Sequence, residues 1–339
     1  MIYLKPFLAT ALGNMLIALL FPTFVLAQNT AVPAPAGEVT GAGNFIHIVE
    51  DLDRSLAFYQ ALLGADPRGG MEPRAFGSIE QVGQMYDAVG AEFRGATIPV
   101  PNTDLGMEFL EWRGVQRAAL EEHFYDPGSP VFLLFVREMD VALDAVITHG
   151  GSVVTPSGEA VGTDRKFIFV QDPDGYFVEL LQMVPDPATQ QENNVLSAQF
   201  RFTVADANQT GDFYNSAFGF DFPTAGEFND DDMLGAITGL ESARFRMLKG
   251  MVPGSNLNVE LFDFARPDKR RIQQSLPAVG SSILRIFVRD LDLSVSKALR
   301  AGAVLAANNE QAVIFDNGNR MQIIEDRDGL LLQLVERSQ

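Results

Sequence analysis

The chain has 339 residues, of which 47% are hydrophobic and 20% charged, and its 44 acidic against 25 basic side chains give a formal net charge of -19. This composition excludes a disordered or fibrous chain, because there is enough apolar surface to offset the entropy lost on folding. The acidity argues against nucleic acid as a partner, and the absence of Cys excludes thiolate metal sites and disulfides.

The first 27 residues have the features of a signal peptide. Lys5 supplies a positive charge, an apolar run follows over 7–26, and Val25-Leu26-Ala27 forms a small-x-small cleavage site. We therefore expect cleavage after Ala27 and export to the periplasm or the medium, with no membrane contact afterwards.

The alternative is an uncleaved membrane anchor. Asn14 and Pro22 interrupt the apolar run and so disfavour a membrane span. Residues 28–43 follow, are rich in Ala, Pro and Gly, and are expected to form a flexible linker.

The segments after this linker follow one order, which is a strand, a helix and three strands. Residues 44–50 are β-rich, the apolar spacing over 53–63 predicts a helix ending at Gly64, and strands are expected near 93–98 and 105–112. The order returns with a strand at 131–136, a helix at 139–149 and strands near 152–155, 166–171 and 176–182. Asp172-Pro173-Asp174-Gly175 predicts a turn between the last two strands.

The same landmarks recur in the second half of the chain. Val49-Glu50-Asp51 returns 155 positions later as Val204-Ala205-Asp206, and Asp174-Gly175 returns 154 positions later as Asp328-Gly329. Such ordered matches predict a tandem duplication, with domains at 44–183 and 197–336 joined by a linker at 184–196. The expected fold is α+β, with four βαβββ modules.

Two runs carry a resemblance to a known family. NFIHIVEDLDRSLAFYQALLGAD and FIFVQDPDGYFVELLQ resemble the vicinal oxygen chelate superfamily, which includes glyoxalase I, extradiol dioxygenases and bleomycin resistance proteins. The resemblance covers nearly the whole mature chain. It implies paired βαβββ modules with curled mixed sheets around funnel-shaped cavities, which usually hold a divalent metal. It does not name a reaction, because one scaffold hosts many chemistries.

The resemblance also implies where metal ligands would lie. The first-strand ligand stands seven residues before an Asp, which gives Asn44 and Gln199 but the apolar Val131 and Ile283 in the other two modules. The last-strand positions are those of Glu108, Glu179, Glu260 and Gln333.

The way the modules pair decides which of these residues meet. If each half forms its own funnel, Asn44, Glu108 and Glu179 meet, and Gln199, Glu260 and Gln333 meet. If modules pair across the halves, Gln199, Glu260 and Glu179 form one set and Asn44, Glu108 and Gln333 the other. Glu179 belongs to the more acidic set in both schemes.

Two carboxylates and an amide suit a divalent cation such as Mn, Mg, Ca or Zn. They argue against a dioxygenase, because iron oxygenases normally use two His and one carboxylate. The alternative is a pocket without metal, as in the bleomycin-binding members of the family. In either case Glu179, Glu108 and Glu260 are the candidate catalytic carboxylates.

The remaining candidates are aromatic or imidazole side chains. Trp112 shares a strand face with Glu108 by two-residue alternation, so it either stacks on a ligand, in a pocket with Gln333, or packs in the core. Alternation turns His47 to the face opposite Asn44, which favours a packed histidine. His149 is expected to end a helix and His123 to lie in a loop.

Three classes of function remain open from the sequence. The first is an exported lyase or isomerase in which a divalent cation polarises a small oxygen-rich substrate. The second is a protein that binds or sequesters a small molecule without metal, as a monomer or homodimer. The third is an interaction module, favoured if side chains such as Phe109, Phe177 and Leu332 fill both funnels.

Overall fold

The computed structural model describes residues 39–72, 74–115, 123–186, 192–241, 243–266, 268–307 and 311–338. All of them belong to one compact unit that spans 34–339. The expected signal peptide lies outside the described residues, so cleavage and export stay predictions. Within the described ranges, no helix is long and apolar enough to cross a membrane.

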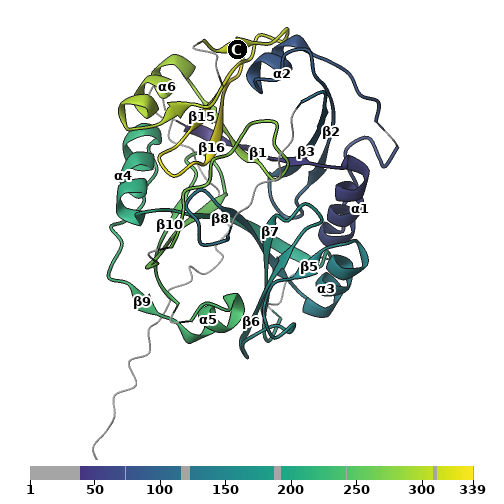
Figure 1. Ribbon diagram of the computed structural model, residues 1–339, viewed down its shortest axis with the longest axis vertical. Coiled ribbons are helices and arrows are strands. Elements are labelled where there is room, and N and C mark those ends of the chain that lie inside the picture. The colour runs from purple at the N-terminus through teal and green to yellow at the C-terminus, as the bar shows by residue number, and fades with distance from the viewer. Residues whose placement is uncertain are drawn as a thin grey trace, which may run out of the picture. The chain divides into compact units, whose positions relative to one another are not determined.

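The strands form two mixed sheets (Figure 1). The first sheet contains β1 (Val39–Val49), β2 (Glu92–Pro99), β3 (Gly106–Arg113), β12 (Ser282–Val288), β13 (Val304–Leu305), β14 (Val313–Ile314), β15 (Arg320–Glu325) and β16 (Leu331–Glu336). The second sheet contains β4 (Pro130–Val136), β5 (Ser152–Val153), β6 (Arg165–Gln171), β7 (Phe177–Met183), β8 (Val195–Thr203), β9 (Asn229–Asp230), β10 (Arg244–Met251) and β11 (Asn258–Phe264). The α+β class and the repeated βαβββ order are therefore confirmed.

Each sheet joins modules from different halves of the chain. In the first sheet β1 pairs antiparallel with β12, and in the second β4 pairs antiparallel with β8. The first sheet thus combines the first and fourth modules, and the second sheet combines the second and third. Of the two pairing schemes, the structure adopts the one across the halves. The boundaries predicted for the duplicated domains stay predictions.

The helices begin and end where short-range signals place them. They are α1 (Leu52–Leu63), α2 (Glu80–Met85), α3 (Met139–Thr148), α4 (Ala207–Phe218), α5 (Asp232–Thr238) and α6 (Leu291–Arg300). Asp51 caps α1 by accepting from the Arg54 amide, and Gly64 ends α1 at a φ of 63°, a left-handed conformation that glycine adopts without strain.

The long helices pack in pairs on one face of the sheets. Helix α1 contacts α3, and α4 contacts α6, so each helix pair stays within one half of the chain (Figure 1). The main core lies between these helices and the sheets, and Phe45 of β1 stacks on Phe200 of β8 at a centroid distance of 4.3 Å. The opposite face of each sheet carries the candidate site residues and is called the polar face below.

Two equivalent Asp-x-Asp-Gly turns fasten the modules within each half. Asp172 accepts from the Tyr59 hydroxyl at 2.9 Å, and Asp326 accepts from the Tyr214 hydroxyl at 2.8 Å. Since the sheets join modules across the halves and the turns join them within a half, the four modules form a closed ring. We therefore expect the described unit to unfold cooperatively.

The second of these turns predicts a pH-dependent stability. Burial, and then the neighbouring Asp328 carboxylate, raise the pKa of Asp326 to about 7. The pKa of an unfolded Asp is near 4, so the folded state holds an additional proton between these two values. The stability that Asp326 contributes is complete below about pH 4 and is lost as pH rises through about 7, with a slope of at most about 1.4 kcal/mol per pH unit.

Asp326→Asn tests this expectation. The variant keeps an oxygen for the backbone amides of Asp328 and Leu330, which Asp326 now binds at 2.8 and 2.9 Å, but it does not titrate. Melting temperatures measured from pH 4 to 8 are expected to fall less steeply than those of the parent. Asp172→Asn in the equivalent turn is the matched control. Parallel curves for the parent and Asp326→Asn would contradict the assignment.

Candidate functional site

The second sheet brings Gln199, Glu260 and Glu179 together on its polar face. Gln199 and Arg201 lie two residues apart on β8 and so share a face, and Arg201 stands opposite Glu260 of β11 in the parallel register. Glu179 lies on β7, beyond β4, where the residue opposite Arg201 is the small Val131. Glu179 stands opposite the next residue of β4 on this face, Leu133, so the long Arg201 side chain crosses β4 diagonally to reach Glu179.

Arg201 bonds to both acids of this set. Its Nη1 donates to Glu179 Oε2, while its Nη2 and Nε donate to Glu260 Oε2 at 3.1 and 3.2 Å. The guanidinium carbon also lies 4.0 Å from the ring centre of Phe262. Glu179 and Glu260 are 3% and 7% exposed, so these ion pairs are shielded from water.

Lys249 of β10 adds a second cation at the edge of this set. Its Nζ lies 3.2 Å from Gln199 Oε1 and 3.7 Å from Glu260 Oε1. The Lys249 side chain is 39% exposed, in contrast to the acids. The site is thus buried around Arg201 and reaches solvent at Lys249.

The charges of the buried pair depend on each other. Burial raises the pKa of Glu179, Arg201 opposes this rise, and the nearby Glu260 carboxylate adds to it. Burial disfavours the charge on Arg201, but the Glu179 and Glu260 carboxylates outweigh burial and raise the pKa of the guanidinium. Arg201 therefore stays protonated, and its charge is what keeps a carboxylate tolerable at Glu179.

The first sheet brings Asn44, Glu108 and Gln333 together in the corresponding place. Asn44 Nδ2 donates to Glu108 Oε2 at 3.0 Å, and Arg285 contacts the same oxygen at 3.0 Å. Arg285 Nε also donates to Gln333 Oε1 at 2.5 Å, and the Gln333 amide reaches the Met85 sulfur at 3.2 Å. An arginine again lies among the residues predicted as ligands.

These contacts test whether the two sets suit a metal. In each set one oxygen of every carboxylate already contacts an arginine, and no imidazole takes part in these contacts. The sets fit a guanidinium better than a bound divalent ion. The assignment of Glu179, Glu108, Glu260, Gln199 and Asn44 as metal ligands, and of the acids as catalytic groups, stays a prediction.

Apolar side chains cover much of both polar faces. On the first sheet, Trp112 is fully buried and packs on Tyr86 and Phe93 at centroid distances of 5.3 and 5.1 Å. The cavity between α2 and β15 measures about 10 Å³, hardly enough for one water. Trp112 therefore packs in the core. The ligand pocket predicted around Trp112 and Gln333 stays a prediction.

On the second sheet, helix α5 covers one end of the polar face. Leu234 and Ile237 of α5 pack with Phe177 and Phe262. Phe109 and Leu332, whose filling of the funnels would have favoured an interaction module, belong instead to the core on the helix side of the first sheet. Of the three named fillers, only Phe177 lies on a polar face.

The other end of this face is only partly covered. Phe135 and Met183 are half-buried there, whereas the half-buried Phe167, Phe245 and Met247 pack against the cluster that contains Leu234 and Ile237 of α5. The register of β6, β7, β10 and β11 places these side chains on the same face as Glu179 and Glu260.

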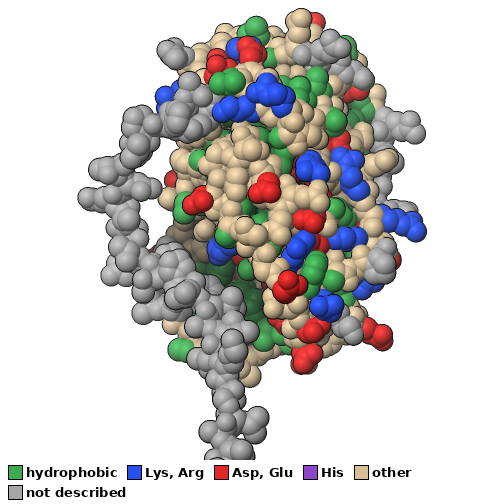
Figure 2. Space-filling view, turned by 90° about the vertical axis from the view of Figure 1, so that its left-hand side faces the viewer, with side chains coloured by type: hydrophobic (Ala, Val, Ile, Leu, Met, Phe, Trp, Pro, Cys, Tyr) green, Lys and Arg blue, Asp and Glu red, His purple; other side chains and the backbone are tan. Residues whose placement is uncertain are grey.

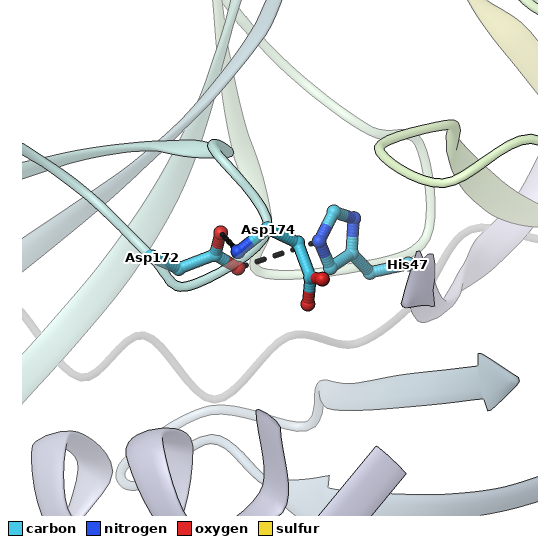
Figure 3. Close-up of side chains that lie close together, drawn as sticks. All are labelled: His47, Asp172 and Asp174. Carbon is cyan, nitrogen blue, oxygen red and sulfur yellow. Dashed lines mark hydrogen bonds and ion pairs between the residues drawn. The ribbon is translucent and has the colours of Figure 1, made fainter. Parts of the chain in front are cut away.

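A separate group of His47, Asp172 and Asp174 can hold a metal ion by its geometry (Figure 3). One ligand atom from each lies within 4.8 Å of the others. His47 Nε2 lies 3.3 Å from Asp172 Oδ2, and His47 Nδ1 lies 3.1 Å from Ser282 Oγ. His47 is fully buried, in agreement with the packed histidine expected from strand alternation.

The equivalent turn, which contains Asp326 and Asp328, indicates that this group is mainly structural. Asp326 and Asp328 make the same helix contacts as Asp172 and Asp174, yet the residue 155 positions after His47 is Phe202. The turn therefore forms without an imidazole. The carboxylates of Asp172 and Asp174 already accept from Tyr59, Arg54 and Ser55.

Sequence reasoning missed Arg201, Arg285 and Lys249. Two-residue alternation from Gln199 could have found Arg201, because both then lie on one strand face. The contacts of Arg285 and Lys249 depend on which strands become neighbours, so the sequence held no comparable signal for them. Of the other histidines, His149 ends α3 as expected, and the loop residue His123 lies 3.0 Å from Asp126.

Comparison with known proteins agrees with this fold. Residues 43–180 match the model of the Glyoxalase/Bleomycin resistance protein/Dioxygenase superfamily. The chain is 26% identical over 145 residues to a protein of Vibrio parahaemolyticus named "Probable lactoylglutathione lyase", which covers 41% of this chain and 91% of that protein.

A solved structure extends the likeness over most of the chain. Glyoxalase I from Zea mays matches with a TM-score of 0.56 and 16% identity, over 89% of this chain and 92% of that chain. At this identity the likeness concerns the fold alone. Residues 43–180, less than half of the chain, therefore carry the match to the glyoxalase, bleomycin resistance protein and dioxygenase superfamily, and the βαβββ order of the remaining modules agrees with it.

Proposed function

We propose that the protein binds a small molecule on the polar face of the second sheet, and that it does so with side chains alone. The observation that carries this proposal is the bonding of Arg201 to both Glu179 and Glu260. A cation of the protein itself thus lies between the two acids predicted to hold a metal. This favours a metal-independent binding protein over a metal-assisted lyase or isomerase.

The residues around Arg201 indicate the chemistry of the ligand. A guanidinium has five N–H donors, and its bonds to the described acids use three of them. The remaining donors, with the Lys249 ammonium, suit oxygen acceptors such as a carbonyl or carboxylate. The half-buried Phe135, Phe167 and Phe245 suit an apolar or aromatic body. We therefore propose an oxygen-bearing molecule with an apolar part.

The location of the protein and the chemical class of its ligand form part of the same proposal. The leader expected over residues 1–27 supports binding outside the cytoplasm. Figure 2 shows Lys and Arg interspersed with Asp and Glu on the face in view, with no broad basic patch there. This supports a small-molecule ligand rather than a nucleic acid.

Thermal shift measurements test the proposal. Small carboxylates and carbonyl compounds with aromatic or aliphatic bodies are screened with and without EDTA. A true ligand at 100 times its Kd should stabilise the protein by about 2.7 kcal/mol, and EDTA should not reduce this effect. Lys249→Met should weaken binding about 10-fold, because it removes the exposed cation of the site.

Lys297→Met provides the matched control. Lys297 lies in the last turn of α6, which packs on β15 and β16 of the first sheet, so this variant should bind as the parent does. Stabilisation that EDTA abolishes would contradict metal-independent binding. Equal ligand affinity in Lys249→Met and the parent would contradict the location.

The similarity to the lactoylglutathione lyase supports a second candidate, a metal-assisted lyase or isomerase. In that case Glu179 and Glu260 would serve as ligands or proton carriers in the second sheet. Elemental mass spectrometry of the mature protein, purified without chelator, separates the two candidates. About one equivalent of Mn, Mg, Ca or Zn that Glu179→Gln removes would favour the lyase.

A further inference from the structure

The two sheets balance their buried acids with cations from different positions. The equivalents of Arg201 and Lys249 in the first sheet are Ile46, 155 positions earlier, and Thr97, 152 positions earlier. Register confirms both relations, because Ile46 and Thr97 stand opposite Glu108 as Arg201 and Lys249 stand opposite Glu260.

The first sheet obtains its cation from the other central strand. Arg285 of β12 contacts Glu108, and the residue 152 positions before Arg285 is Leu133 of β4. The two arginines therefore do not descend from one duplicated residue. Nonetheless an arginine contacts the candidate acids in both sheets.

The number of cations also follows the number of acids. The first sheet has Gln333 where the second has Glu179, and correspondingly Thr97 where the second has Lys249. Glu108 faces the single cation Arg285, whereas Glu179 and Glu260 face Arg201 and Lys249. Each set is thus neutral, with no excess negative charge to attract a divalent ion.

We propose that Arg201 and Lys249 take the place of a divalent cation between Glu179, Glu260 and Gln199, and that removing them turns these residues into a site for Mn²⁺ or Ca²⁺. Two carboxylates and an amide oxygen are ligands that such hard cations accept. With both positive charges gone, the buried acids carry two uncompensated charges, which a divalent ion neutralises. The set of Asn44, Glu108 and Gln333 in the first sheet would not become a metal site on loss of its arginine, because that set has one carboxylate.

This inference concerns the site of the proposed function but does not depend on any ligand. A variant that lacks the guanidinium of residue 201 can bind a metal even if the parent protein binds no small molecule. Conversely, ligand binding at Lys249 would survive a failure of the exchange. The two proposals therefore fail separately.

The test replaces both cations by their equivalents from the first sheet. Arg201→Ile/Lys249→Thr is titrated with Mn²⁺, and free Mn²⁺ is followed by electron paramagnetic resonance. We expect one bound Mn²⁺ per chain, at least 10-fold tighter than any binding to the parent, and a rise in melting temperature with Mn²⁺ that the parent lacks. Adding Glu179→Gln should abolish both effects.

Further variants keep the test decisive. Arg285→Leu, the equivalent change in the first sheet, should gain no Mn²⁺ site. If the double variant does not fold, Arg201→Gln/Lys249→Thr keeps a neutral polar side chain of similar length at position 201 and should also gain Mn²⁺. Failure of a folded Arg201 variant to gain Mn²⁺ would overturn the proposal. So would a parent that binds one Mn²⁺ which Glu179→Gln removes.

Discussion

Trp112→Ala is expected to lower the free energy of unfolding by about 3–5 kcal/mol, the range for truncating a buried large aromatic side chain. Trp112 is fully buried between Tyr86 and Phe93, so its removal leaves a cavity that neighbouring side chains cannot easily fill. Urea unfolding followed by circular dichroism measures the loss. Fluorescence is unsuitable because Trp112 is the sole tryptophan of the chain.

Two other variants separate packing from polarity at this position. The Trp112 indole N–H has no hydrogen-bond partner among the described residues, so Trp112→Phe should cost clearly less than Trp112→Ala. Ile147→Ala, at an exposed position of α3, should change stability by no more than about 0.5 kcal/mol. A loss for Trp112→Ala as small as that for Ile147→Ala would show that Trp112 is not a core residue.

Glu179→Leu is expected to cost about 3–5 kcal/mol, because it leaves the buried Arg201 with one acid in place of two. The Glu179 side chain is 4% exposed, so water cannot replace the lost partner. Arg201→Met should cost a similar amount, since it leaves two buried carboxylates near each other. Both losses are measured by urea unfolding at pH 7.

A double variant of Arg201 and Glu179 distinguishes ion pairing from simple packing. If Arg201 and Glu179 interact directly, Arg201→Met/Glu179→Leu should lose less than the sum of the two single losses. Asp230→Ala removes the exposed pair with Arg244 and should have a much smaller effect. Strictly additive losses in the double variant would mean that the two residues are not energetically coupled.

The local elements were predictable because short-range signals determine them. The helix expected over 53–63 is observed as Leu52–Leu63, ended by Gly64 as expected. The strands expected near 93–98 and 105–112 are observed as Glu92–Pro99 and Gly106–Arg113. Helices α2 and α5 were not predicted, since six or seven residues are too few to show helical periodicity. These two helices contribute to covering the polar faces.

The candidate residues were predictable only as alternatives. The family resemblance implied Gln199, Glu260 and Glu179 as candidates, but both pairing schemes agreed with the sequence. Neighbouring strands in a sheet are chosen by contacts between residues far apart in the chain, such as Phe132 of β4 on Phe200 of β8. Only the folded sheets therefore show that these three residues form one set.

The sequence by itself determined the βαβββ order of the four modules and, through the family resemblance, the positions of the candidate acids, because both can be recognised in the order of residues along the chain. The tertiary structure decided how the modules pair and which charges meet. Arg201 reaches Glu179 across the intervening strand β4, and Lys249 reaches Gln199 from another strand. A buried charge is tolerated only beside an opposite charge, and its partner can come from any strand that the fold brings within a few ångströms.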